Sequence, residues 1–284
     1  MTRLIVNADD FGLTSGVNRA IVELHRESLV TSTTLMARAA ATEEAIEIGR
    51  STPSLGVGCH VALVDGEPML QAARIPTLAD RQTGQFQTTP GRFLARLLTG
   101  RIRSSEIEAE VAAQIAHLQD RGLCLTHIDA HKHMHMFPAV LRPMLRAAKA
   151  AGIRAVRNPF EPSWSQFATH LSPWIRRMEV RLLRRLEPAF RRIVAEEGFT
   201  TTDGAIGVLA TGTLDEAAIS SLLRALPEGT FELVTHPGYN DPDLARAHTR
   251  LLAAREVERK ALHAVALFPA IDFISFNDLD SWSH

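Results

Sequence analysis

The chain has 284 residues, a formal net charge of −1 at pH 7 and 45% hydrophobic residues. The near-neutral charge argues against bulk nucleic-acid binding, which usually requires a strongly basic face. Two cysteines, Cys59 and Cys124, are too few for a disulfide framework and favour a reducing compartment. No apolar run approaches the roughly 20 residues that span a bilayer, and carboxylates at positions 9 and 10 interrupt any secretory signal. We therefore expect a soluble cytoplasmic protein that binds no nucleic acid.

Short strand-like runs alternate with longer amphipathic runs from the N-terminus to residue 63. The run RLIVNAD is typical of a buried strand, and Val17, Ile21 and Leu24 recur after it at helical spacing. Thr14 or Ser15 is a suitable N-cap for that helix. In order, the predicted elements are a strand at 3–9, a helix at 15–29, a strand at 30–37, a helix at 41–51 and a strand at 55–63.

Residues 65–103 interrupt the alternation. This segment is rich in proline, glycine and glutamine and shows no clear apolar period. Long irregular segments inside a compact domain are usually functional loops. We therefore expect an active-site loop insertion with little regular structure of its own.

The alternation resumes after the insertion and continues to the end of the chain. The predicted elements are a helix at 104–122, a strand at 125–131, a helix at 138–152, strands at 154–159 and 205–212, a helix at 214–226, a strand at 231–238, a long helix at 243–267 and a strand at 271–278. About eight strands separated by helices favour a parallel sheet, and this number predicts a distorted (β/α) barrel. A doubly wound open sheet is the alternative. No repeat or low-complexity linker divides the chain, so we expect one domain over 1–284.

Residues capable of chemistry fall where the predicted strands end. In a barrel of parallel strands the C-terminal strand ends meet at one rim, where active sites are found. The fold prediction therefore places residues that are far apart in sequence in one site. These residues are Asp9, Asp10, His60, His131, Arg157 and His236.

One aspartate and two neutral imidazoles form a three-ligand set that leaves coordination positions open for water or substrate. A metal bound in this way lowers the pKa of its water and generates a nucleophile near pH 7. A neighbouring carboxylate can accept the proton of that water, and a histidine across the site can protonate a leaving group. Asp9, Asp10 and His236 thus complete the parts for metal-assisted hydrolysis.

The stretch LTHIDAHKHMHMFP places four histidines within nine positions. Strand alternation puts His127, Asp129 and His131 on one face. If the chain turns helical after Ala130, His131 and His135 instead pair at spacing i, i+4. A structural role is expected for His127, and substrate or indirect contacts for His133 and His135. The sequence leaves these alternatives open.

Four motifs resemble, in order, those of the YdjC-like (ChbG-type) carbohydrate deacetylases. They are LIVNADDFG, GVGCHVALVDG, THIDAHKHMHMFP and LVTHPGY. The likeness covers most of the chain and is weakest in 70–105 and 160–200. Two further stretches, PWIRRMEVRLLRRL and GFTTTDGAIGV, resemble the branch of this family that is associated with hopanoid biosynthesis.

The resemblance implies a distorted α/β barrel that binds one divalent metal ion and hydrolyses the N-acetyl group of an amino sugar. Carried onto matching positions, it implies that Asp10, His60 and His131 are the metal ligands. It further implies that Asp9 is the general base and His236 the general acid.

Three further expectations depend on the resemblance. Arg157 orients the base or the substrate. The metal is Mg²⁺, as usually described for the family, or Zn²⁺, which two imidazoles and one carboxylate suit at least as well. The substrate is an N-acetylated sugar or glycolipid, with N-acetylglucosamine on a hopanoid lipid as the specific expectation.

Residues 172–193 combine apolar residues at near-helical spacing with seven arginines, and Pro188 is expected to break or kink the segment. A basic amphipathic helix can lie transiently on an anionic membrane, which would place the protein at the inner membrane surface. The alternative, which the barrel prediction favours, is an ordinary helix that packs its apolar face inward. Oligomer formation is left open.

Two other functions use the same residues. Aspartate and histidine sites also serve metal-dependent phosphoesterases, although two-metal phosphatases normally need more carboxylates than we locate. A noncatalytic sugar-binding or lipid-binding protein of the same fold would be expected to lack the base or the acid. Asp9 and His236 are both present, which favours the enzyme.

Overall fold

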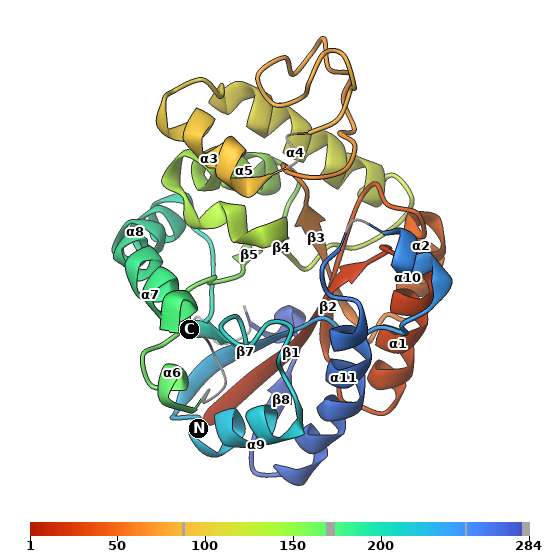
Figure 1. Ribbon diagram of the computed structural model, residues 1–284, viewed down its shortest axis with the longest axis vertical. Helices are drawn as coiled ribbons and strands as arrows, with labels where there is room; N and C mark the ends of the chain where they lie inside the picture. Colours follow the sequence, from red (N-terminus) through yellow and green to blue (C-terminus); the bar gives the residue numbers. More distant parts are fainter. Residues whose placement is uncertain (87–88, 169–173, 248, 280–284) are drawn as a thin grey trace.

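The computed structural model describes residues 1–86, 89–168, 174–247 and 249–279. Eight parallel strands form one sheet in the order β5-β4-β3-β2-β1-β7-β6, with β8 also paired to β1 (Figure 1). The strands are β1 (Thr2–Phe11), β2 (Ser32–Leu35), β3 (Gly56–Val61), β4 (His127–Ala130), β5 (Ala155–Val156), β6 (Gly204–Ile206), β7 (Gly229–Thr235) and β8 (Asp272–Ile274).

The sheet curves into a half-barrel, which confirms the predicted α/β barrel-like fold and excludes the open doubly wound sheet. The two edge strands β5 and β6 are short, and a single parallel bridge between Ala155 and Thr200 links the two sides. Around it, Val156 N donates to Thr200 O at 3.0 Å and Thr200 N donates to Arg154 O at 2.8 Å. This side of the barrel is therefore much more weakly hydrogen-bonded than the side built on β1.

Helices surround the sheet (Figure 1). They are α1 (Ser15–Arg26), α2 (Thr42–Ser51), α3 (Pro90–Leu98), α4 (Ser104–Gln119), α5 (Pro138–Ala150), α6 (Ser165–Ala168), α7 (Trp174–Leu183), α8 (Glu187–Glu197), α9 (Glu216–Arg224), α10 (Pro242–Arg246) and α11 (Ala253–Ala261), with 3₁₀ turns η1 (His131–Met136), η2 (Arg184–Leu186), η3 (Leu262–Leu267) and η4 (Phe276–Asp278). Thr14 caps α1 by accepting a hydrogen bond from Val17 N, one of the two predicted caps.

Strand alternation separates two apolar clusters. Leu4 and Val6 of β1 belong to the large cluster under the helices, whereas Ile5 belongs to a small cluster with Ala155 and Phe276. Ile5 and Ala155 lie on strands far apart in the sheet order, so their shared cluster fills the barrel interior. The large apolar cluster contains residues from Leu4 to Val265.

Small residues on β3 make room inside the barrel. A Cβ atom on Gly58 would lie 2.5 Å from the ring of His127, which stacks on Phe276 with ring centroids 3.7 Å apart. His60, two residues after Gly58, faces the same interior at the C-terminal end of the strand. Stacked rings and apolar side chains therefore fill the barrel interior away from the rim. Toward the rim, at the C-terminal ends of the strands, the interior is polar.

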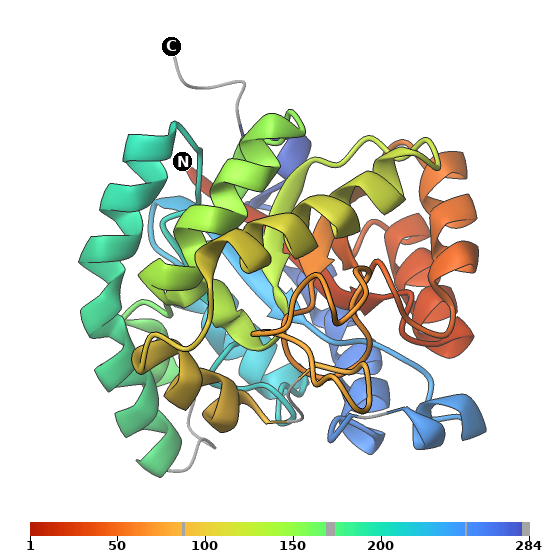
Figure 2. The ribbon, with the colours of Figure 1, turned by 90° about the horizontal axis from the view of Figure 1, so that it is seen from above.

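The insertion at 65–103 has more regular structure than predicted. Thr89 caps α3 and Pro90 occupies its first turn, a helix-start signal that the sequence carries. Ala79 and Phe86 form an antiparallel bridge, and Phe86 and Phe93 are fully buried. Figure 2 shows α3, α4 and the connecting loops lying over one side of the strands.

The prediction of one continuous long helix at 243–267 is wrong. The structure has α10, α11 and η3 in its place. Ala247 takes an extended backbone conformation and ends α10. The separate helix α11 then directs Arg255 and Glu258 at the rim of the barrel, as described below.

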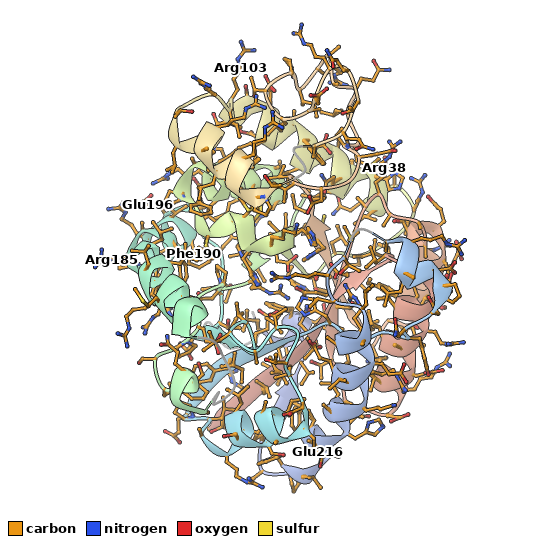
Figure 3. All side chains as sticks on the ribbon, viewed as in Figure 1. Arg38, Arg103, Arg185, Phe190, Glu196 and Glu216 are labelled. Atoms are coloured by element: carbon orange, nitrogen blue, oxygen red, sulfur yellow. The ribbon has the colours of Figure 1, made fainter. Side chains whose placement is uncertain are left out.

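Of the segment 172–193, the described residues from Trp174 onward form α7, the 3₁₀ turn η2 and most of α8, and Pro188 lies in the first turn of α8. Phe190 and Ile193 are buried, so α8 packs inward; Figure 3 shows Phe190 pointing toward the sheet while Arg185 points outward. Residues 172 and 173 and the side chains of Trp174 and Ile175 lie outside what the structure describes. Among the described residues, no helix is long and apolar enough to cross a bilayer.

Candidate active site

Two adjacent carboxylates at the end of β1 face one site because the strand is irregular there. In a regular strand Asp9 and Asp10 would point to opposite faces. The register with β2 shifts between Ala8 and Phe11, and Asp10 has a positive φ of 64°. Such backbone is costly for a non-glycine residue and is often found at functional sites. The irregularity brings both carboxylates to the rim.

Asp10, His60 and His131 form a compact triangle of donor atoms. Asp10 Oδ1 lies 3.5 Å from His60 Nε2 and 3.4 Å from His131 Nδ1, and the two ring nitrogens are 3.2 Å apart. Bonds of about 2.0–2.2 Å to one ion separate tetrahedral ligands by roughly 3.4 Å and octahedral neighbours by roughly 3.0 Å. Asp10 Oδ1 is buried and has no hydrogen-bond partner among the described residues. The three side chains therefore fit one divalent cation.

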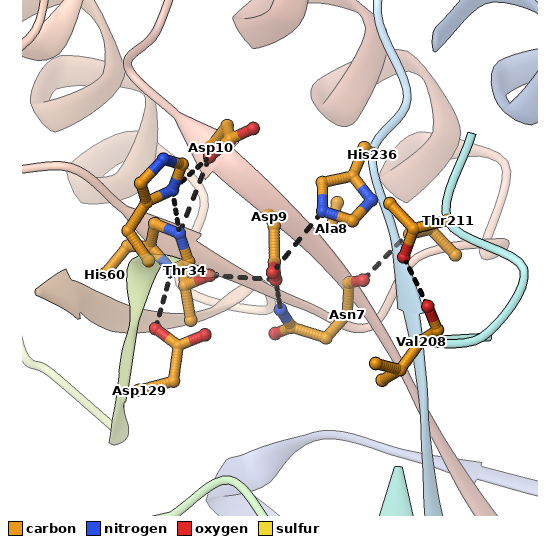
Figure 4. Close-up of polar contacts among 12 residues, drawn as sticks. Asn7, Ala8, Asp9, Asp10, Thr34, His60, Asp129, Val208, Thr211 and His236 are labelled. Atoms are coloured by element: carbon orange, nitrogen blue, oxygen red, sulfur yellow. Dashed lines mark hydrogen bonds and ion pairs between the residues drawn. The ribbon is translucent and has the colours of Figure 1, made fainter. Parts of the chain in front are cut away.

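Asp129 of β4 orients the first imidazole. His60 Nδ1 lies 2.7 Å from Asp129 Oδ1 (Figure 4). A proton on Nδ1 therefore leaves Nε2 directed at Asp10 and His131. Burial would lower the pKa of His60, but Asp129 raises it to about 9. A carboxylate behind a ligating imidazole is a common way of fixing its tautomer and orientation.

Arg157 follows β5 and is completely buried among three carboxylates. Its Nη1 and Nη2 donate to Asp9 at 2.8 and 2.6 Å, Nε donates to Glu232 at 2.7 Å, and Nη1 also contacts Asp129. Burial would raise the pKa of Asp9, but the Arg157 guanidinium holds it well below its usual range. Burial raises the pKa of Glu232 to about 7 despite the same arginine.

Asp9 also accepts hydrogen bonds from uncharged neighbours. Asn7 Nδ2 and Thr34 Oγ1 donate to its Oδ1 at 2.9 and 3.1 Å (Figure 4). Asp9 Oδ1 therefore has three donors, while Oδ2 has one donor and faces His236. The carboxylate is ionised and held in one orientation.

His236 lies across the site from Asp9, directly after β7. Its Nε2 is 3.8 Å from Asp9 Oδ2, and its side chain is 12% exposed (Figure 4). Glu258 Oε2 accepts a hydrogen bond from the backbone N of His236 at 2.6 Å and lies 3.7 Å from its Nδ1. Burial would lower the pKa of His236, but Glu258 raises it above the usual value.

The remaining histidines of the 125–138 stretch have other surroundings. His127 and Asp129 share the inner face of β4, whereas His131 begins η1. His135 Nδ1 accepts a hydrogen bond from Ala130 N at 3.2 Å and its Nε2 lies 3.3 Å from Arg157 O. His135 thus does not pair with His131 around an ion. Burial lowers the pKa of His133 to about 3.

The strained backbone of η1 adjoins the insertion. Lys132 and His133 have φ values of 55° and 54°, and the Lys132 ammonium contacts the Asp65 carboxylate. Asp65, at the start of the insertion, itself has a φ of 57°. The 65–103 segment is therefore tied to the turn that carries His131.

A second cluster, Asp9, His60 and Asp129, also has donor atoms within 4.8 Å of one another. Arg157 already neutralises both of its carboxylates. The guanidinium thus disfavours a cation there, and the triangle of Asp10, His60 and His131 is the better candidate for a metal centre.

Every predicted site residue lies at this rim, and four more contribute that the prediction did not place in the site. Asp129 is two residues before His131 and alternates with it in the predicted strand, and Glu232 is a lone carboxylate in an apolar strand. Both signals can be recognised in the sequence. Arg255, which donates to Asp10 Oδ2, and Glu258 lie on α11 among other charged residues, and no pattern distinguishes them.

Comparison with known proteins gives a consistent family. A family model described as "YdjC-like protein" matches residues 3–271. A protein from Thermoanaerobacter pseudethanolicus named carbohydrate deacetylase is 29% identical over 262 residues, 92% of this chain and 91% of that protein. Another of that name from Brevibacillus brevis is 42% identical over 158 residues, 56% of this chain and 60% of that protein.

A solved structure has the same fold. It is a protein of Enterococcus faecalis V583 described as a cellobiose-phosphate cleavage protein, with a TM-score of 0.77 and 24% identity over 98% of both chains. The match of the family model over nearly the whole chain is the deciding observation. The chain belongs to the YdjC-like family.

Proposed function

We propose that this chain is a metal-dependent hydrolase that removes the acetyl group from an N-acetylated amino sugar. The family and its curated relatives support a carbohydrate deacetylase. The single observation that carries the mechanism is the arrangement of the rim. A triangle of cation-binding atoms lies beside Asp9, and His236 faces Asp9 at 3.8 Å.

Asp10, His60 and His131 would hold the divalent ion, which would supply Lewis-acid activation of water and of the amide carbonyl. Asp9 accepts a proton from the attacking water at Oδ2, the oxygen that faces His236. Arg157 keeps this carboxylate ionised and fixes its plane. Being fully buried, Arg157 orients the base and does not contact the substrate.

His236 donates the second proton. Its Nε2 delivers a proton to the amide nitrogen as the C–N bond breaks, so that acetate and a free amine leave. Glu258, beside Nδ1, keeps the imidazole protonated until that step. Two imidazoles and one carboxylate suit Zn²⁺ or another transition metal better than Mg²⁺, which prefers oxygen ligands.

The specific substrate that we propose is N-acetylglucosamine on a hopanoid glycolipid, an assignment that rests on the sequence resemblance of 173–186 and 198–208. Contact with an anionic inner membrane surface through 172–193 is supported by Met178 and Leu182, which are 60% and 61% exposed on α7 beside Arg181 and Arg185. Vesicle binding with and without anionic lipid tests this contact. Binding that does not depend on anionic lipid, or that is unchanged in the double variant Arg181→Gln/Arg185→Gln, would exclude it.

Acetate release tests the proposed activity. The purified protein, loaded separately with Zn²⁺, Mg²⁺ or Mn²⁺, is assayed on a panel of N-acetyl sugars, N-acetylglucosamine glycolipids and phosphate esters. Asp9→Asn should lower kcat by about 10²–10⁴-fold, the usual contribution of a general base. Because Asp9 is not one of the three ligands, the variant should still bind the ion. Phosphate release in place of acetate would favour a phosphoesterase, and wild-type acetate release by Asp9→Asn would remove Asp9 from the mechanism.

A further inference from the structure

The two oxygens of Asp10 have different partners. Oδ1 faces His60 and His131 and has no hydrogen-bond donor among the described residues. Oδ2 accepts a hydrogen bond from Arg255 Nη2. A carboxylate that is free on both sides can bind a cation through one or both oxygens. Bidentate binding of a cation by Asp10 would need Oδ2, and Arg255 is already hydrogen-bonded to that oxygen.

Arg255 is fully buried, and Asp10 is the only carboxylate within ion-pair distance of it in the described part of the chain. Its Nη2 also lies 3.5 Å from Thr249 Oγ1, while Nε and Nη1 have no partner among the described residues. Arg157, by contrast, contacts three carboxylates. Within that part of the chain, the charge of Arg255 is therefore paired with one oxygen of one carboxylate, Asp10 Oδ2.

Stability does not explain such a pair well. Removing a guanidinium from water is costly, and buried ion pairs often stabilise a fold no better than apolar residues of the same size. The Nε and Nη1 nitrogens, which have no partner among the described residues, add to that cost. A specific task at Asp10 accounts for the arrangement better than a general contribution to folding.

The backbone around Arg255 fixes its position. Gly238 N donates to Arg255 O at 3.2 Å, and a Cβ atom on Gly238 would lie 3.1 Å from Arg255 Cδ. Glu258, one helical turn further along α11, accepts the hydrogen bond from His236 N. The same face of one helix thus reaches the candidate ligand Asp10 and the candidate proton donor His236.

We propose that Arg255 is a positioning residue that restricts Asp10 to binding a divalent cation through Oδ1 alone. The restriction preorganises a compact site of one oxygen and two nitrogens, which suits Zn²⁺ and similar transition metals better than Ca²⁺ or Mg²⁺. This inference rests on the proposed metal centre. It adds a residue that binds neither the ion nor the substrate and acts only through Asp10.

Calorimetric titration of the metal-free protein with Zn²⁺ tests the proposal without an activity readout. Arg255→Met should weaken Zn²⁺ binding by about 10–100-fold, the usual effect of losing a group that orients a ligand. Arg255→Lys keeps a cationic donor and should lose less. Arg246→Met is the matched control, because Arg246 lies exposed on α10 and pairs only with Asp243 among the described residues; its affinity should equal that of the wild type.

A background that lacks the carboxylate separates positioning from a general effect. In Asp10→Asn, adding Arg255→Met should cause no further loss of Zn²⁺ affinity. A full additional loss there overturns the proposal, and so does wild-type affinity in a folded Arg255→Met. If Arg255→Met does not fold, Arg255→Lys decides. An ammonium cannot fix the carboxylate as a guanidinium does, so several-fold weaker binding supports the proposal and unchanged binding overturns it. A wild-type protein that binds no divalent ion would instead refute the metal centre itself.

Discussion

Two neighbouring carboxylates of one strand have different surroundings, and this difference divides their roles. Asp9 is bound through both oxygens by Arg157, so its charge is neutralised and its orientation is fixed. Asp10 is bound through one oxygen by Arg255, which leaves the other directed at two imidazoles. The register shift in β1 and the positive φ of Asp10 bring the two carboxylates into one site. Two buried arginines then give the two carboxylates different hydrogen-bond partners.

Glu258→Gln tests the proton donor. Glu258 raises the pKa of His236, and loss of its negative charge should lower that pKa. The proposed reaction needs protonated His236, so activity is lost as pH rises through this pKa. The high-pH limb of the kcat/KM profile should therefore move to lower pH, while the amide oxygen still accepts the bond from His236 N. Activity on the acid side should change little.

The control for this variant lies on the same helix. Glu256 pairs with Lys260 and Arg259 at the surface, so Glu256→Gln should leave both limbs of the profile in place. A high-pH limb that does not move in Glu258→Gln would show that His236 does not limit the reaction at alkaline pH.

Residues at strand ends were predictable because parallel strands deliver their C-terminal ends to one rim. By this rule alone, Asp9, Asp10, His60, His131, Arg157 and His236 were predictable as members of one site. Arg255 and Glu258 were not, because they enter from a helix packed against the rim. The local sequence of a helix does not distinguish a buried charged residue from a solvated one, because burial depends on how the helix packs.

At the scale of elements, the 65–103 insertion is anchored to α4 by carboxylates that bind its backbone. Glu110 accepts hydrogen bonds from Met69 N and Leu70 N at 2.7 and 3.0 Å, and Glu106 accepts one from Thr77 N at 2.7 Å. Irregular backbone needs such partners where it is buried. The insertion is thus held against α4 at these points.

Glu110→Ala should lower the free energy of unfolding by about 1–3 kcal/mol, because two partly buried N–H groups lose their acceptor. Cleavage by a protease within 65–78 should become faster than in the wild type. Denaturant unfolding and limited proteolysis measure the two effects. Glu108→Ala, two residues away on α4 and without a contact to the insertion among the described residues, should change neither. Equal stability of both variants would mean that Glu110 does not hold the loop.

The elements that the sequence predicted well have strong periodic signals, whereas the misplaced ones depend on turns. The strands β1 and β7 contain apolar runs of several residues, and both were expected. The helix α3 was missed although Thr89 and Pro90 form a start signal, because the surrounding composition suggested a loop. The break between α10 and α11 follows the extended backbone at Ala247, which no proline or glycine marks.

At the scale of the whole molecule, the candidate ligands connect three separate parts of the barrel rim. Asp10 ends β1, His60 lies near the end of β3 and His131 starts η1 after β4. A cation held by all three cross-links segments that only the sheet and the helices otherwise join. Removing the ion should therefore affect the stability of the fold as well as the reaction.

We expect chelation to abolish acetate release and readdition of Zn²⁺ to restore it. The melting temperature of the metal-free protein should rise with Zn²⁺ concentration, because an ion that binds only the folded state stabilises it by about 2.7 kcal/mol at 100 times its Kd. His60→Ala removes one of the three ligands, so its melting temperature should respond far less to added Zn²⁺. The exposed-site variant His263→Ala should respond as the wild type does, since His263 contacts only Lys260 and Glu27 among the described residues. Full activity after exhaustive chelation, or equal thermal responses of His60→Ala and the wild type, would contradict a metal centre built on β1, β3 and η1.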